Sequence, residues 1–282
     1  MRSSRRLSRQ PADEAQRKKV IGIFDSGVGG LSVFREVRLL LPDRPVIYVG
    51  DQAHVPYGPR KLEEVRDFSF EISRWLMSQG CTTIVVACNT ASAAALHELR
   101  AAYPQTNFVG MEPAVKPAAE QTRSGVVGVL ATPATFQGKL YASVVERFAK
   151  DVKIYTNTCP GLVAEIEAGR LDGDATRRIL TDALTPMLAA GIDTVVLGCT
   201  HYPFVIPLIR EIVGESVRVI DPAPAVARQV ARLASGSPSE YMPEPRVCTT
   251  GEPDAVEFFI RTILGVEIHV EKLVWRDGHL EG

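Results

Sequence analysis

Short apolar runs alternate with longer amphipathic segments along most of the chain. The first run, Val20–Phe24, leads through a glycine-rich turn into a helical pattern that extends to about Leu41. Similar runs follow at Pro45–Val49, Thr83–Cys88 and Asn107–Gly110, separated by helical patterns. Continuous β-branched runs are typical of buried parallel strands, and their alternation with helices predicts a doubly wound α/β sheet with right-handed crossovers.

The pattern then begins again in the second half of the chain. Gly125–Thr132 resembles the first run at an offset of 106, and Val152–Tyr155 resembles the second at 107. The run that ends at Cys199 resembles the one that ends at Cys88, 111 residues earlier. Three correspondences in the same order predict two similar α/β units. A chance likeness between apolar strands is the alternative.

The last 60 residues predict further elements. Helical patterns cover Pro224–Leu233 and Asp254–Leu264, on either side of a Pro/Ser/Gly-rich link at Ser235–Pro245. Arg246–Thr249 and Glu267–Leu273 are expected to be two short strands that return to the first unit.

Cys88 and Cys199 each close a predicted strand, at the sheet edge where open α/β folds bind their ligands. Polar residues follow both: Asn89-Thr90 after the first and Thr200-His201 after the second. A strand-to-helix turn favours the thiolate form of a cysteine. Two thiols on opposite sides of one carbon, one as base and one as acid, would invert its stereochemistry by proton transfer. The simpler interpretation of either residue alone is a buried structural cysteine.

Charge and cysteine content exclude several classes of protein. The formal net charge is −1, which argues against a nucleic-acid interface. No apolar run approaches the ~18 residues of a membrane span. The five cysteines are scattered without paired spacing, which argues against a disulfide framework or a zinc site and favours a reducing, cytoplasmic location.

Residues 1–19 differ from the rest, with seven basic side chains against two acidic ones. Their few apolar residues predict a disordered basic tail. An Arg- and Ser-rich start is also found in transit peptides, which is the alternative.

Asp25-Ser26-Gly27-Val28-Gly29-Gly30 forms the predicted turn after the first strand. It fits neither a P-loop nor a dinucleotide-binding fingerprint. Its exposed N–H groups would suit a carboxylate, and Asp25 could carry a proton; a purely structural turn is the alternative. No His, Asp and Cys cluster has metal-ligand spacing, and no lysine is placed as a cofactor Schiff base. We therefore expect no metal and no cofactor.

Six segments together resemble one family, the glutamate racemases of the aspartate/glutamate racemase superfamily. In chain order they are Ile21–Val33, Val55–Gly58, Ala87–Ala93, Ala131–Thr135, Cys159–Val163 and Leu197–Pro203. The resemblance implies two α/β domains that close over the substrate, with the active site in the crevice between them. It also implies a cofactor-independent isomerase that supplies D-glutamate for peptidoglycan, and thereby for cell wall biogenesis and cell shape.

The resemblance also implies roles for individual residues. Cys88 would remove the α-proton of D-glutamate and Cys199 that of L-glutamate. Asp25 and His201 match auxiliary acid/base positions beside these thiols, and Glu165 matches a further auxiliary carboxylate. The positions that match substrate-binding residues are Asp25, Ser26, Tyr57, Gly58, Asn89, Thr90, Thr200 and His201. Gln52 and His54 depart from the family, which more often has a small hydroxyl residue and an arginine there.

The expected first domain comprises residues 20–114 and 225–282, with Asp25 and Cys88; the second comprises 115–224, with Glu165, Cys199 and His201. Aspartate is the rival substrate, since one methylene discriminates by only ~1–3 kcal/mol. Two rival classes are a non-catalytic amino-acid-binding protein and a thiol-disulfide protein. The resemblance implies a small-molecule substrate and a homodimer. It adds two partners found for some family members, a cell-wall precursor as activator and DNA gyrase.

Overall fold

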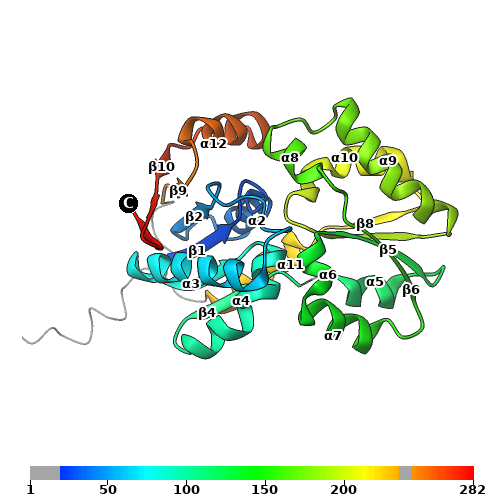
Figure 1. The fold of residues 1–282 in the computed structure, drawn as a ribbon, viewed down its shortest axis with the longest axis horizontal. Coiled ribbons are helices and arrows are strands. Elements are labelled where there is room, and N and C mark those ends of the chain that lie inside the picture. Colours follow the sequence, from blue (N-terminus) through cyan, green and yellow to red (C-terminus); the bar gives the residue numbers. More distant parts are fainter. Residues whose placement is uncertain (1–19, 113, 235–242) are drawn as a thin grey trace, which may run out of the picture.

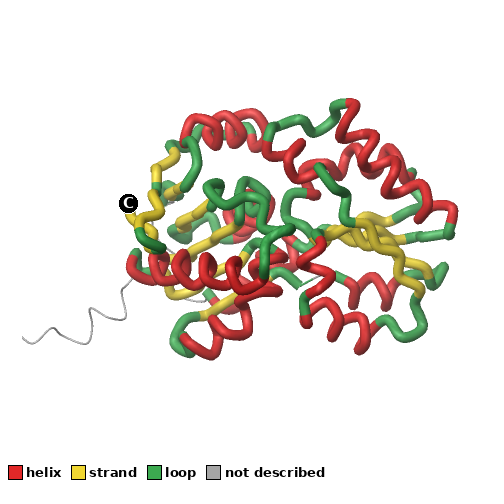
Figure 2. Tube along the Cα trace, in the orientation of Figure 1, coloured by secondary structure: helices red, strands yellow, loops and turns green. Residues whose placement is uncertain are grey.

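The computed structural model describes residues 20–112, 114–234 and 243–282, with Leu140 described in its backbone alone. Two lobes lie side by side, each built around a parallel sheet with helices on both faces (Figures 1 and 2). The predicted fold class, two doubly wound α/β domains, is therefore confirmed. The predicted tail at 1–19 and most of the predicted link at Ser235–Pro245 lie outside the described residues.

The first sheet has six parallel strands in the order β10-β9-β2-β1-β3-β4. They are β1 Val20–Asp25, β2 Val46–Gly50, β3 Cys81–Val86, β4 Asn107–Gly110, β9 Arg246–Thr249 and β10 Val270–Lys272. Its main helices are α2 Leu31–Leu40, α3 Leu62–Ser78, α4 Asn89–Ala102, α11 Ala223–Leu233 and α12 Pro253–Phe259. A π-helical turn, Ile260–Leu264, continues α12.

The second sheet has four parallel strands in the order β6-β5-β7-β8. They are β5 Val126–Ala131, β6 Lys153–Asn157, β7 Thr194–Gly198 and β8 Arg218–Ile220. Its helices are α5 Val115–Gln121, α6 Pro133–Gln137, α7 Lys139–Phe148, α8 Leu162–Glu167, α9 Asp174–Ala189 and α10 Ile206–Val213. A 3₁₀ turn, Tyr202–Val205, precedes α10.

Both sheets repeat one strand order, because β2-β1-β3-β4 in the first corresponds to β6-β5-β7-β8 in the second. The three sequence correspondences thus fall on equivalent strands. In each lobe the strand before the thiol, β3 or β7, lies directly beside the first strand of its unit. The limits of the two domains at residues 114 and 225 stay a prediction.

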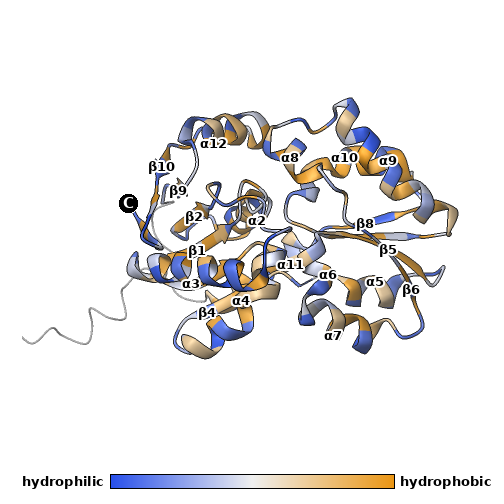
Figure 3. Ribbon diagram, viewed as in Figure 1, coloured by the Kyte–Doolittle hydropathy of each residue, from blue (hydrophilic) through white to orange (hydrophobic). Residues whose placement is uncertain are grey.

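Side chains alternate between two buried faces of each sheet, which explains the continuous apolar runs. In β1, Ile21 and Ile23 pack on one side with α2, whereas Phe24 packs on the other with α3 and α4. Figure 3 shows the apolar colouring concentrated on the strands and inner helix faces, with hydrophilic colouring on outer faces. Among the described residues, no helix has the length and apolarity needed to span a membrane.

The C-terminus holds an element that the sequence analysis did not predict. β11 Val274–Arg276 and β12 His279–Glu281 form an antiparallel hairpin beyond β10. Its turn, Asp277-Gly278, has φ values of 48° and 79°. Asp-Gly at two positive-φ positions is a strong hairpin signal.

Candidate active site

A cavity of about 290 Å³ lies between the two lobes. This volume lies just below the roughly 300–1,000 Å³ that is typical of small-molecule sites. Residues from both halves line it: Ser26, Pro56, Tyr57, Gly58, Pro59, Cys88, Asn89, Thr90, Thr132, Pro133, Thr158, Cys159, Pro160, Gly161, Val163, Ala164, Cys199, Thr200, His201 and Tyr202. Both predicted thiols therefore reach one cavity from equivalent strand ends.

Cys88 forms the N-terminal cap of α4. Its sulfur accepts a hydrogen bond from the Ala91 N–H (3.5 Å), and the helix begins at Asn89. The thiol lies 4.0 Å from the Ser26 hydroxyl. Burial and the nearby Asp25 charge raise the pKa of Cys88 well above its usual range, although the Ala91 and Ser26 hydrogen bonds oppose the shift. These surroundings favour the neutral thiol.

Cys199 has a different neighbour, an imidazole. Nδ1 of His201 lies 3.7 Å from the Cys199 sulfur, and Nε2 of His201 lies 2.5 Å from Oε1 of Glu167. Burial lowers the pKa of His201, but its hydrogen bonds to Cys199 and Glu167 and the Glu167 charge outweigh burial and raise that pKa well above the ordinary value. The raised pKa of His201 keeps a positive charge on the imidazole beside the Cys199 sulfur.

Asp25 lies beneath the cavity and is fully buried. Its carboxylate accepts hydrogen bonds from the Gly27 N–H (3.0 Å) and from the Thr200 hydroxyl of the other half (3.0 Å). Burial raises the pKa of Asp25, while the charge of His201 lowers it and offsets part of the rise. Asp25 is thus placed to influence both thiols without lining the cavity.

The glycine-rich turn after β1 lies against the Cys199 side of the site. The Val28 N–H donates to Oε1 of Glu167 (2.9 Å). A Cβ atom on Gly27 would overlap the Glu167 carboxylate, and one on Gly29 would overlap the His201 ring. A side chain at either position would therefore displace Glu167 or His201 from its observed place.

The predicted substrate-binding residues, Asp25 excepted, lie on the cavity wall: Ser26, Tyr57, Gly58, Asn89, Thr90, Thr200 and His201. The side chain of Asn89 is buried, and neither its amide oxygen nor its amide nitrogen has a hydrogen-bond partner among the described residues. Buried polar atoms normally have partners, so an open amide on a cavity wall indicates a polar ligand. Thr90 bonds Thr132 across the lobes (Oγ1–Oγ1 2.9 Å).

The structure does not bring Glu165 to this cavity. Its carboxylate is paired with the exposed Arg170 (Nε–Oε2 2.6 Å), whose hydrogen bond lowers the pKa of Glu165. Glu167, which the sequence analysis did not name, contacts His201 instead. Glu165 and Glu167 are two positions apart on α8, so their side chains point in directions about 200° apart around the helix axis. Glu167 lies four positions after Val163, which lines the cavity, but the sequence alone does not show which face of this helix meets the cavity.

Cys159 is a third buried thiol on the cavity wall, and the sequence analysis gave it no role. Its φ of +44° places a non-glycine residue in the left-handed region. Burial, together with the charge of Cys199, raises the pKa of Cys159 to about 12.

Across 20–112, 114–234 and 243–282, no three His, Cys, Asp or Glu side chains are grouped to hold a metal ion. What the cavity does combine is two thiols with opposite electrostatic surroundings and the open amide of Asn89 on its wall. Such an arrangement can remove a proton from one face of a small polar molecule and return one to the other.

Comparison with known proteins identifies the family of the chain. The Asp/Glu/Hydantoin racemase family matches residues 29–230. The glutamate racemase of Ectopseudomonas mendocina is 49% identical over 261 residues, covering 90% of this chain and 99% of that protein. The chain belongs to the Asp/Glu/Hydantoin racemase family. It is a racemase, and hence an isomerase.

Solved structures show the same likeness. The glutamate racemase isoform RacE1 of Bacillus anthracis superposes with a TM-score of 0.82 at 33% identity, covering 94% of this chain and all of that one. Escherichia coli glutamate racemase, in complex with L-glutamate and the activator UDP-MurNAc-Ala, gives 0.82 at 31% identity, covering 94% and 100%.

Proposed function

We propose that this protein interconverts L- and D-glutamate by transferring the α-proton between two cysteines, with no cofactor. The observation that carries the proposal is that Cys88 and Cys199 line the same cavity from different lobes, each at the end of an equivalent strand. Glutamate is preferred over aspartate because the relatives of high identity are glutamate racemases.

In the proposed reaction Cys199 acts as the base toward L-glutamate. The protonated His201 next to its sulfur stabilises the thiolate, and Glu167 holds the imidazole. Cys88, whose pKa is raised by burial and by Asp25, supplies the proton to the opposite face. The reverse reaction exchanges the two roles, with Cys88 taking the α-proton of D-glutamate.

The rest of the cavity wall holds the substrate. The open amide of Asn89 offers both a donor and an acceptor, which suits the carboxylate and ammonium groups of an amino acid. Asn89 and Thr90 begin α4, so the helix N-terminus faces the same region and favours a carboxylate there. Ser26, Gly58 and Thr200 add polar contacts, and Tyr57 forms part of the wall.

The enzyme would supply D-glutamate for peptidoglycan and would act in the cytoplasm. Its two domains would have the limits predicted from the sequence. The Escherichia coli relative is described with the activator UDP-MurNAc-Ala, which supports testing a cell-wall precursor as an activator here. A homodimer and a contact with DNA gyrase remain predictions.

The purified, reduced protein tests the proposal directly. Circular dichroism should show L-glutamate losing its optical activity without added cofactor, whereas L-aspartate should change far more slowly. Inactivity toward glutamate, with and without UDP-MurNAc-Ala, would exclude the proposed substrate. Faster loss of the aspartate signal would reassign the protein to aspartate.

A further inference from the structure

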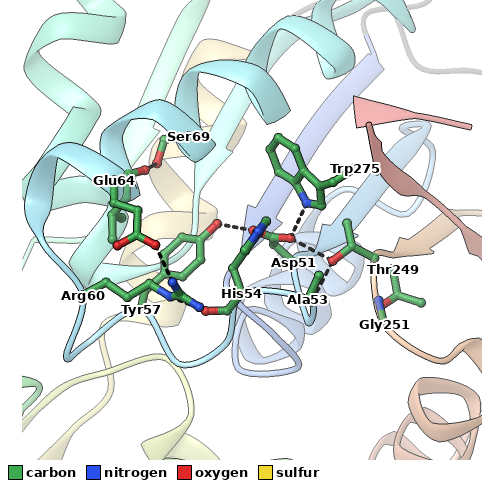
Figure 4. A network of polar contacts seen from close by, with 12 residues as sticks. Asp51, Ala53, His54, Tyr57, Arg60, Glu64, Ser69, Thr249, Gly251 and Trp275 are labelled. Carbon is green, nitrogen blue, oxygen red and sulfur yellow. Dashed lines mark hydrogen bonds and ion pairs between the residues drawn. The ribbon is translucent and has the colours of Figure 1, made fainter. Parts of the chain in front are cut away.

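Asp51, just after β2, is a fully buried carboxylate that accepts hydrogen bonds from four side chains (Figure 4). Oδ1 accepts from the Thr250 hydroxyl and from Nε1–H of Trp275, both at 2.8 Å. Oδ2 accepts from the Tyr57 hydroxyl at 2.6 Å and from Nδ1 of His54 at 2.9 Å. A carboxylate has about four acceptor sites, so Asp51 has none left for a substrate. It fixes the positions of its donors.

Tyr57 connects this network to the active site. Its hydroxyl points to Asp51, while Tyr57 and its neighbours Pro56 and Gly58 line the cavity. Burial and the Asp51 charge raise the pKa of Tyr57 well above 10, so the phenol remains a hydrogen-bond donor. A residue of the cavity wall is therefore held by a direct hydrogen bond to Asp51.

Trp275 brings the C-terminal hairpin into the same network, 224 positions after Asp51. Its ring packs against Phe68 of α3 (centroids 5.6 Å apart) and edge-on against His54 (5.1 Å). His54 in turn stacks on Phe68 at 3.9 Å. The hairpin is anchored separately, because the Leu280 N–H donates to Glu71 of α3 (3.1 Å).

We propose that the C-terminal hairpin sets the shape of the substrate cavity, with Trp275 as a positioning residue that acts through Asp51 on Tyr57. The hairpin lies outside the two repeated units and is joined to the cavity wall by these two hydrogen bonds in series. The proposal rests on the proposed function, since it assigns Tyr57 to the glutamate site. Trp275 does not itself line the cavity and acts only through Tyr57, which forms part of the substrate-binding wall. Its effect therefore falls on substrate binding rather than on proton transfer.

The test compares two tryptophan substitutions. Trp275→Phe keeps an aromatic ring beside Phe68 but removes the donor to Asp51; it should raise the KM for glutamate about 3- to 10-fold, with kcat within about twofold. Trp75→Phe is the matched control, because Trp75 is a buried tryptophan on α3 of the same lobe and is not part of the Asp51 network. The KM of Trp75→Phe for glutamate should stay within about 1.5-fold of the KM of the unaltered protein.

A double-mutant cycle separates positioning from general destabilisation. On a Tyr57→Phe background, which breaks the connection to Asp51, Trp275→Phe should cause no further rise in KM. Should Trp275→Phe not fold, Thr250→Val removes a second donor to the same oxygen and should raise KM in the same way. An unchanged KM in the folded variant, or an equal rise on both backgrounds, would overturn the inference. Absence of racemisation in the unaltered protein would instead overturn the proposed function.

Discussion

The surroundings of Cys88 and of Cys199 differ, although the two thiols occupy equivalent places in two units of the same strand order. Cys88 lies near a hydroxyl, a backbone N–H and the buried carboxyl of Asp25. Cys199 lies near an imidazole whose pKa is raised, held by Glu167. The repeated backbone places the two sulfurs, whereas the unrepeated side chains give each sulfur a different electrostatic environment.

Replacing either thiol should have the largest effect. Cys88→Ser and Cys199→Ser should each lower the racemisation rate by about 10³-fold or more, because a serine hydroxyl is a far weaker acid than a thiol and proton-transfer groups contribute roughly 10²–10⁴-fold. Circular dichroism measures the loss.

The same two variants should differ in which enantiomer still exchanges its α-proton with D₂O. Cys88→Ser should exchange the α-proton of L-glutamate only, and Cys199→Ser should exchange that of D-glutamate only. Proton NMR measures the loss of the α-proton signal in each case. Racemisation within tenfold of normal in either variant would remove the two-thiol mechanism. Exchange of the wrong enantiomer would reverse the assignment of faces.

Two glutamates on α8 allow a matched comparison on the Cys199 side. Glu167→Gln removes the anion that holds His201; hydrogen bonds to charged groups are worth about 1.5–3 kcal/mol, so kcat/KM should fall about 10- to 150-fold. Glu165→Gln breaks only a contact with Arg170 and should leave activity within about twofold. Equal losses in the two variants, measured by steady-state kinetics, would contradict the placement of Glu167 in the site.

A smaller effect is expected from filling the space beside His201. Gly29→Ala places a methyl group against the imidazole; overpacking costs about 1–3 kcal/mol, and kcat/KM should fall about tenfold. Gly173→Ala is the control, since a Cβ there meets nothing within 4 Å. The prediction fails when the two alanine variants have equal kcat/KM.

The smallest expected effect is a shift in pH dependence. Because the pKa of His201 is raised, its proton persists into the alkaline range, and activity should fall only as pH rises beyond the ordinary imidazole range. Glu167→Gln removes a cause of that raised pKa, so the alkaline limb of the kcat/KM profile should move to lower pH. Identical profiles for Glu167→Gln and the unaltered protein would show that His201 does not control this limb.

The sequence predicted the parts of the molecule that follow from local pattern. Continuous β-branched runs predicted the strands, and the nearly constant sequence offset between corresponding runs matched the strand order that the two sheets share. The sequence did not show which face of α8 meets the site. Val163, Glu165 and Glu167 lie on this one short helix, and only its orientation against His201 distinguishes the two carboxylates.

Contacts between distant segments also escaped prediction. The hydrogen bond between Trp275 and Asp51 forms only when the chain folds, and no local sequence pattern around either residue predicts the other as its partner. The hairpin that carries Trp275 did have a local signal, Asp277-Gly278, but its strands are only three residues each. Strands so short give almost no periodicity to read.

The most direct test of two thiols acting from opposite faces is isotopic. L-glutamate is incubated with the unaltered protein in D₂O, and both enantiomers are isolated early in the reaction. Newly formed D-glutamate should carry deuterium at Cα while the remaining L-glutamate keeps its proton, because the thiol that delivers the new hydrogen is not the one that removed the old. D-glutamate that retains the original proton would show that a single base removes and returns it, and would rule out the two-thiol mechanism.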